Sequence, residues 1–213
     1  MSQKLHIEII SDHVCPWCFI GKRRLEKALE LCPDIVAEIS WLPFQLSPDM
    51  PREGVKRDDH YREIFGEERA AQIANSMKDT GAEEGIVFGS SPDAMSPNTL
   101  AAHTLMLWAS EAPGIDVNVL VEELFVAHHV ECADLGDHDV LARIATKVGM
   151  DEASVREGLA VTKDEERVQE LIQQSASRGV KGVPFFVIND RYGLSGAQPA
   201  DTLADAFRQI LAD

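Results

Sequence analysis

Basic residues, cysteines and long apolar runs are all scarce in this sequence. Its 20 lysine and arginine residues are outnumbered by 36 aspartate and glutamate residues, which gives a formal net charge of −16. Phosphate groups repel a chain of this charge, so we exclude nucleic acid and anionic membrane surfaces as partners. No apolar run approaches the length of a membrane span, and no charged, then apolar, then small-residue leader opens the sequence. We therefore expect a cytoplasmic protein.

The four cysteines include a single Cys-x-x-Cys pair. A zinc site would need two further ligands, and no second pair supplies them. Because the cytoplasm keeps thiols reduced, a reversible, redox-active dithiol explains the pair better than a permanent structural disulfide does. Two unreactive core cysteines are the other explanation. The remaining cysteines, Cys32 and Cys132, are expected to be free thiols.

The pair lies in Cys15-Pro16-Trp17-Cys18, between a strand expected over residues 5–10 and a helix expected over residues 19–29. One helical turn brings both thiols within bonding distance, and the unpaired N–H groups at the helix N-terminus favour a thiolate at Cys15. Pro16 suits the first turn, which needs no backbone N–H. A Cys-x-x-Cys at a strand-to-helix junction is the redox arrangement of thioredoxin-like proteins.

Along the rest of the sequence, the expected secondary structure changes from strands and helix together to helices alone, and then back to strands and helix. A second strand is expected over residues 35–42, and strands return over residues 183–188 and 191–194 before a last helix opened by Pro199. Apolar periodicity between them predicts helices over residues 62–80, 99–109, 117–130, 140–148 and 165–177. We therefore predict an α/β thioredoxin-like fold of order βαβ…ββα over residues 1–50 and 179–213. A large all-helical insertion would occupy residues 51–178.

Several stretches resemble the FrnE-like branch of the DsbA family. They are Cys15-Pro16-Trp17-Cys18 with Ile20-Gly21-Lys22-Arg23-Arg24-Leu25-Glu26-Lys27-Ala28, Trp41-x-Pro43-Phe44-x-Leu46-x-Pro48-Asp49-Met50-Pro51, Asn98-Thr99-x-x-Ala102-His103, and Gly182-Val183-Pro184-Phe185-Phe186-Val187 with Ser195-Gly196-Ala197-Gln198. The resemblance runs along nearly the whole chain. It implies a thioredoxin fold with a helical insertion and the activity of a protein-disulfide oxidoreductase. Where that family usually carries aromatic residues, this chain has His128-His129.

The resemblance also implies the second half of the site. The Val183–Pro184 bond would be cis and lie opposite the dithiol, offering the Val183 backbone to an extended substrate near Cys15; an X–Pro bond tolerates cis at about 0.5–1 kcal/mol. An ordinary edge proline is the alternative. Cys15 would attack and Cys18 would resolve the mixed disulfide. The predicted substrate-binding residues are Trp17, Val183, Pro184, Asn98 and His103.

Polar residues near these positions have simpler explanations as well. His13 and Pro16 flank the attacking cysteine and are predicted to tune it, although a loop histidine is often only solvated. Asn98 is equally explained as a helix cap, and His103 as a hydrogen-bonded core residue. His128 and Cys132 have the i, i+4 spacing of metal ligands on one helix face, but scattered polar residues at a helix end also produce it, so we predict no metal site.

We expect no bound cofactor, with glutathione or another thiol as a redox partner. The substrate would be a thiol- or disulfide-containing protein or small molecule, and a monomer and a homodimer are both open. One alternative is a glutathione-dependent isomerase or transferase of the 2-hydroxychromene-2-carboxylate isomerase type, which shares the fold but has a Ser at the position of Cys15. A second alternative is a non-enzymatic peptide-binding or chaperone module.

Overall fold

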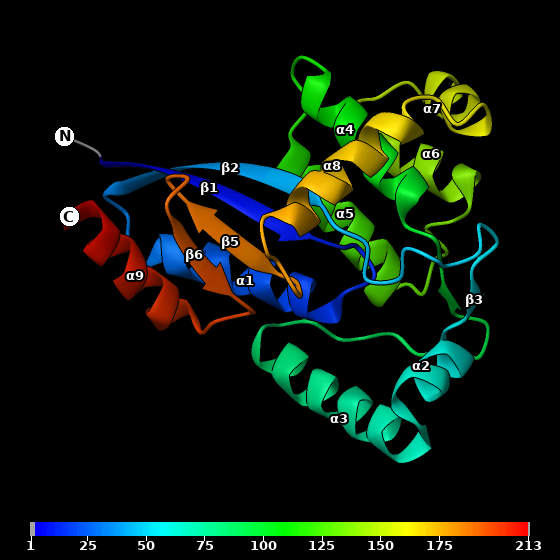
Figure 1. Ribbon diagram of the computed structural model, residues 1–213, viewed down its shortest axis with the longest axis horizontal. Coiled ribbons are helices and arrows are strands. Elements are labelled where there is room, and N and C mark those ends of the chain that lie inside the picture. The colour runs from blue at the N-terminus through cyan, green and yellow to red at the C-terminus, as the bar shows by residue number, and fades with distance from the viewer. Residues whose placement is uncertain (1–2, 213) are drawn as a thin grey trace.

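A four-stranded sheet forms the centre of the computed structural model, which describes residues 3–212 (Figure 1). The strand order is β2-β1-β5-β6, with bounds Ile35–Pro43, Gln3–Ser11, Phe185–Ile188 and Tyr192–Ser195. Strand β1 is parallel to β2 and antiparallel to β5. Its apolar residues Leu5, Ile7 and Ile9 are buried, as the alternation of the sequence predicts.

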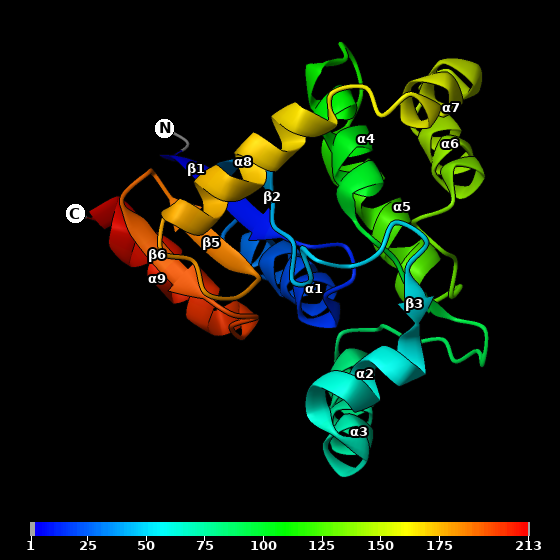
Figure 2. The same cartoon turned by 45° about the vertical axis from the view of Figure 1, so that its right-hand side comes forward.

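Helices cover both faces of this sheet (Figures 1 and 2). Helix α1 (Pro16–Glu30) and helix α9 (Ala200–Ala212) share one core with the sheet, in which Leu25 and Phe207 contact the β1 and β5 side chains. Helix α8 (Glu165–Ser177) lies against β2. The dithiol helix is therefore held between the sheet, the C-terminal helix and the inserted segment.

The inserted segment holds most of the helices. Their bounds are α2 Arg57–Phe65, α3 Glu67–Glu83, α4 Leu100–Glu111, α5 Val117–His129, α6 His138–Lys147 and α7 Glu152–Ala160. A second core cluster joins Phe19 and Ile20 of α1 to Leu105 of α4 and Phe125 of α5. Because this core is shared, the two predicted domains are in close contact, and the boundaries at residues 50 and 178 stay predictions.

The structure confirms the thioredoxin-like fold with a helical insertion but corrects some elements. The single helix predicted over residues 62–80 is wrong: Gly66, with φ of 76°, separates α2 from α3. The apolar period continues through this break, so periodicity alone did not reveal it. Helix α7 was not predicted, and short strands β3 (Val55–Lys56) and β4 (Met95–Ser96) pair within the insertion. Among residues 3–212, no helix is both long and apolar enough to cross a bilayer.

Candidate active site

The two cysteines of the motif occupy the first turn of α1. Cys15 is the N-cap residue, with extended backbone (φ −86°, ψ 111°), and Pro16 follows in the first helical position. The Cys15 N–H donates to the Asp12 carbonyl at 3.1 Å, and the Cys18 N–H donates to the Cys15 carbonyl at 3.0 Å. Both thiols are free and buried, whereas the Trp17 side chain between them is 36% exposed. Trp17 is thus the residue that the motif presents to solvent.

The electrostatics of the pair are asymmetric. Burial raises the pKa of the Cys18 thiol well above its ordinary value, and the hydrogen bond and charge of Cys15 raise it further. The Ser11 hydroxyl and the Asp12 backbone oppose this shift. Cys15 lies at the N-terminus of α1, where the first helix N–H groups have no partner within the helix. Cys18 is therefore the thiol of the pair that holds its proton more tightly than an ordinary cysteine, which favours Cys15 as the nucleophile.

The loop before β5 reaches the dithiol from the other end of the chain. The Val183–Pro184 bond is cis, as expected, and the Cys15 thiol donates to the Val183 carbonyl with Sγ and O 3.6 Å apart. Pro184 also packs against α1, where a Cβ on Gly21 would lie 2.9 Å from the proline ring. A glycine is needed at position 21 because a larger residue would push the two segments apart.

Four histidines are buried behind the dithiol: His13, His103, His128 and His129, here called the buried histidine cluster. The rings of His13 and His103 have centroids 4.7 Å apart, as do those of His128 and His129. Burial lowers the pKa of His13 and of His129 well below the ordinary value, and it lowers the pKa of His128 to about 4. Their rings are therefore neutral near pH 7. The solvated alternative for His13 is wrong, and tuning by His13 would act through ring packing rather than positive charge.

His103 and Asn98 hold loops together. The His103 Nε2 atom lies 2.9 Å from the Phe44 carbonyl and 3.4 Å from Asp12 Oδ1, so it links α4 to the loop that precedes the dithiol. The Asn98 side chain accepts from the Leu100 N–H at 3.0 Å and donates to the Met50 carbonyl at 2.7 Å. The capping and core explanations thus describe their contacts. A substrate contact by either residue stays a prediction.

A cavity of about 640 Å³ adjoins the dithiol loop. It is here called the α2 cavity, because residues of α2 and α3 line it, together with Val14 and Pro16. His128 and His129 also line it. The His128 Nδ1 and His129 Nε2 atoms have no hydrogen-bond partner among residues 3–212. A volume of this size is in the range of small-molecule sites. Sequence reasoning missed its α2 wall, since no motif marks those residues.

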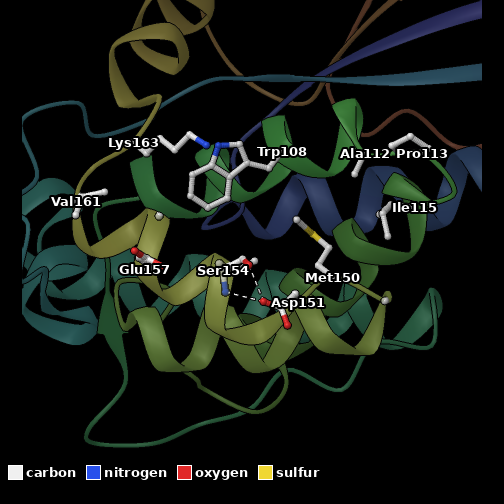
Figure 3. A pocket seen from close by; sticks show the side chains of 13 residues that line it. Trp108, Ala112, Pro113, Ile115, Met150, Asp151, Ser154, Glu157, Val161 and Lys163 are labelled. Carbon is white, nitrogen blue, oxygen red and sulfur yellow. Dashed lines mark hydrogen bonds between the residues drawn. The ribbon is translucent and has the colours of Figure 1, made fainter.

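A second cavity of about 640 Å³ lies within the insertion (Figure 3). Trp108 of α4 covers it, and Met150, Asp151 and Ser154 lie on its opposite side, with Asp151 capping α7. None of the predicted site residues lines this cavity. Of these two cavities, only the α2 cavity borders the dithiol motif, through Pro16.

An ion-pair network positions the dithiol helix. The buried Lys22 ammonium donates to Glu122 of α5 at 2.8 Å and also pairs with Glu26, while Arg23 shares the Glu122 carboxylate. Arg24 pairs with Glu84 at 2.6 Å, next to the end of α3. Sequence reasoning missed these roles, although Lys22, Arg23 and Arg24 lie in the stretch that carries the family resemblance. The network ties α1 to the insertion on two sides.

The histidine and cysteine residues at the end of α5 do not form the face that their spacing suggests. Helix α5 ends at His129, and Cys132 has φ of 58°, so the i, i+4 helical relation does not exist. Over the described part of the chain, no group of three or more His, Cys, Asp or Glu side chains is arranged to hold a metal ion. Cys132 instead lies 3.7 Å from an Arg57 nitrogen.

Comparison with known proteins identifies the family. A family model described as DSBA-like thioredoxin domain matches residues 6–208. The chain belongs to this family. The uncharacterized protein YwbO of Bacillus subtilis (strain 168) is 28% identical over 211 residues, covering 98% of this chain and 96% of that protein. The crystal structure of the probable DsbA oxidoreductase SCO1869 from Streptomyces coelicolor is 28% identical, with a TM-score of 0.86 over 98% of this chain and 91% of that chain.

Two more distant structures share the DSBA-like fold. The cytosolic disulfide reductase DsbM from Pseudomonas aeruginosa is 17% identical, with a TM-score of 0.68 over 98% of this chain and 100% of that chain, and it has also been solved with GSH. A 2-hydroxychromene-2-carboxylate isomerase is 17% identical, with a TM-score of 0.67 over 96% of this chain and 95% of that chain. The fold relationship to that isomerase, expected from the sequence, is confirmed.

Proposed function

We propose that the protein is a thiol–disulfide oxidoreductase in which Cys15 attacks and Cys18 resolves. The observation that carries this proposal is the free Cys15–Cys18 pair at the start of α1, with the Val183 carbonyl of the cis-proline loop 3.6 Å from Cys15 Sγ. A Cys15 thiolate would form a bond to one sulfur of a substrate disulfide and release the other as a thiolate. Attack of Cys18 on Cys15 Sγ would then close the protein disulfide and release the reduced substrate.

The asymmetry of the pair supports this order of steps. Two of the three causes that raise the pKa of Cys18 are the hydrogen bond and the charge of Cys15. Both disappear when Cys15 is bound in a mixed disulfide. Cys18 then loses its proton more easily, at the moment when a resolving thiolate is needed. Trp17 would form an apolar flank for the substrate, and the Val183 and Pro184 backbone would position it.

We further propose glutathione or another thiol as the redox partner, in a cytoplasmic setting and within the FrnE-like branch of the family. The description of DsbM as a cytosolic disulfide reductase, together with its structure with GSH, supports this choice. The glutathione-dependent isomerase is the second candidate, favoured by the shared fold. The presence of both Cys15 and Cys18 disfavours it, because an isomerase of that type needs no resolving cysteine. Chaperone activity without thiol chemistry is the remaining alternative.

The deciding experiment is the Cys15–Cys18 redox equilibrium in glutathione buffers. Trp17 fluorescence would report the transition, thiol alkylation would verify it, and a Trp17→Phe variant would identify the signal that comes from Trp41 and Trp108. A reversible two-electron transition is expected, and its midpoint would distinguish an oxidant from a reductant. Non-covalent glutathione binding without a transition would favour the isomerase. Holdase activity that survives loss of both cysteines would favour the chaperone.

A further inference from the structure

Tyr61 lies on the α2 wall of the α2 cavity. Arg57, Tyr61 and Phe65 are spaced four residues apart, so they share one face of α2, and all three line the cavity. Val14 and Pro16, the residues on either side of Cys15, line the same cavity. Figure 2 shows α2 and α3 as a pair that stands apart from the sheet, beside the segment that contains the start of α1. The Tyr61 ring therefore faces the space next to the dithiol.

The Tyr61 hydroxyl is free to act on a bound molecule. No group within residues 3–212 makes a hydrogen bond to it, while the ring is supported by Phe65, whose centroid lies 5.8 Å away. Burial raises the pKa of Tyr61, the charge of Cys15 raises it further, and Arg57 acts in the opposite direction. The phenol thus keeps its proton and is a hydrogen-bond donor near neutral pH.

We propose that Tyr61 is a further catalytic residue, whose hydroxyl donates a hydrogen bond to the substrate sulfur that leaves when Cys15 attacks. The inference rests on the proposed function and adds a group to it. Tyr61 lines the α2 cavity together with Val14 and Pro16, the residues on either side of Cys15, so a disulfide attacked by Cys15 would extend into the cavity that Tyr61 lines.

The step balances without any added reagent. The Cys15 thiolate forms a bond to the nearer substrate sulfur, the substrate S–S bond breaks, and its electron pair goes to the outer sulfur, which leaves as a thiolate. Tyr61 donates a hydrogen bond and keeps its proton, and water later protonates the released thiolate. The substrate is reduced as the Cys15–Cys18 pair is oxidised. Since the outer sulfur becomes anionic only as the bond breaks, the hydrogen bond is stronger in the transition state than in the bound disulfide.

This role predicts the class of substrate that depends on Tyr61. Alkyl thiolates are strongly basic and leave poorly, so disulfides between alkyl thiols need the donor most. A disulfide whose leaving group takes its proton on a ring nitrogen does not need it. The reagent 2,2′-dipyridyl disulfide is of the second kind, and bis(2-hydroxyethyl) disulfide is of the first; both are small and uncharged.

The test compares these two reagents in single-turnover reactions with the reduced protein, followed by quenching with an alkylating agent and mass measurement. Tyr61→Phe is expected to slow the alkyl disulfide by about tenfold and the dipyridyl disulfide by less than about twofold. Ile64→Val is the matched control, because Ile64 also lines the cavity from α2, and its substitution removes neither a donor nor the ring that packs against Tyr61. It is expected to affect both reactions to the same extent. The dipyridyl reaction also reports that the variant is folded.

Equal slowing of both reagents by Tyr61→Phe, or no slowing of either, would overturn the role of Tyr61. Failure of the proposed function looks different. In that case the unmodified protein would react with neither reagent faster than a Cys15→Ser variant does. The rates of the unmodified protein, compared with those of Cys15→Ser, therefore distinguish failure of the proposed function from failure of the Tyr61 role.

Discussion

The Cys15 sulfur and the Val183 carbonyl oxygen are 3.6 Å apart, although 168 positions separate the two residues in the chain. This contact joins the start of α1 to the cis-proline loop before β5. It exists because β1 and β5 are neighbouring antiparallel strands, so the end of β1 and the start of β5 meet at one edge of the sheet. The same edge holds the predicted attacking thiol and the backbone that would hold its substrate.

Substitution of either cysteine should separate the two chemical steps. We expect Cys15→Ser to abolish turnover, because it removes the attacking sulfur. Cys18→Ser should accumulate a mixed disulfide with the substrate, because it removes the resolving thiol. Mass spectrometry under non-reducing conditions would detect the adduct. Full activity in Cys15→Ser would rule out the proposed mechanism.

Gly21→Val should loosen the contact between α1 and the cis-proline loop. A Cβ at position 21 would lie 2.9 Å from the Pro184 ring, closer than packed atoms tolerate. We expect a loss of about 1–3 kcal/mol in the free energy of unfolding, measured in urea. Gly182→Ala is the matched control, since a Cβ there would meet nothing within 4 Å. Equal effects of the two substitutions would contradict the proposed packing.

The buried histidine cluster should make stability depend on pH. The folded-state pKa of His128 is about 4, below its unfolded value near 6.5, so the unfolded chain binds more protons between these values. The stability that His128 contributes is therefore fully present above about pH 6.5 and is lost as the pH falls toward 4. The loss is on the order of 3 kcal/mol for this residue.

Urea unfolding between pH 7 and pH 4 would measure this effect. In a His128→Leu variant, the free energy of unfolding should fall less steeply as the pH falls, by a slope that corresponds to about one proton bound on unfolding. The slope that remains is due to His13, His129 and the carboxylates. The matched control is His138→Leu, which removes a histidine outside the cluster. An unchanged slope in the His128 variant would show that its ring is not held neutral by the fold.

Glu122→Gln should destabilise the junction between α1 and the insertion. Lys22 is buried, and Glu122 holds both its ammonium group and the Arg23 guanidinium. We expect a loss of about 1–3 kcal/mol, because one partner of a buried charge is removed while Glu26 remains.

The neighbouring Glu123→Gln is the matched control for this prediction. Glu123 pairs with Lys147, whose side chain is 49% exposed, so its loss should change stability by no more than about 0.5 kcal/mol. Urea unfolding of both variants at one pH would compare them directly. Similar effects of the two substitutions would show that the buried network does not position α1.

Much of the candidate site could be predicted from local signals in the sequence. The motif Cys15-Pro16-Trp17-Cys18 predicts a helix start with a reactive thiol, because capping and proline preferences act within one turn. The helix over residues 165–177 was predicted with the bounds that the structure shows. Where apolar spacing continued across a turn, as at Gly66, the prediction was wrong because a period does not report the backbone angle of a glycine.

The sequence by itself determined the family, the fold class and the identity of the dithiol, since these depend on short-range spacing and on motifs that recur along the chain. Only the tertiary structure decided which distant groups surround the thiols. The burial that keeps His128 neutral, the Lys22–Glu122 contact, and the cavity that Tyr61 shares with the residues flanking Cys15 all arise from packing between segments far apart in the chain. Such relations depend on three-dimensional distance and desolvation, which no local pattern of residues records.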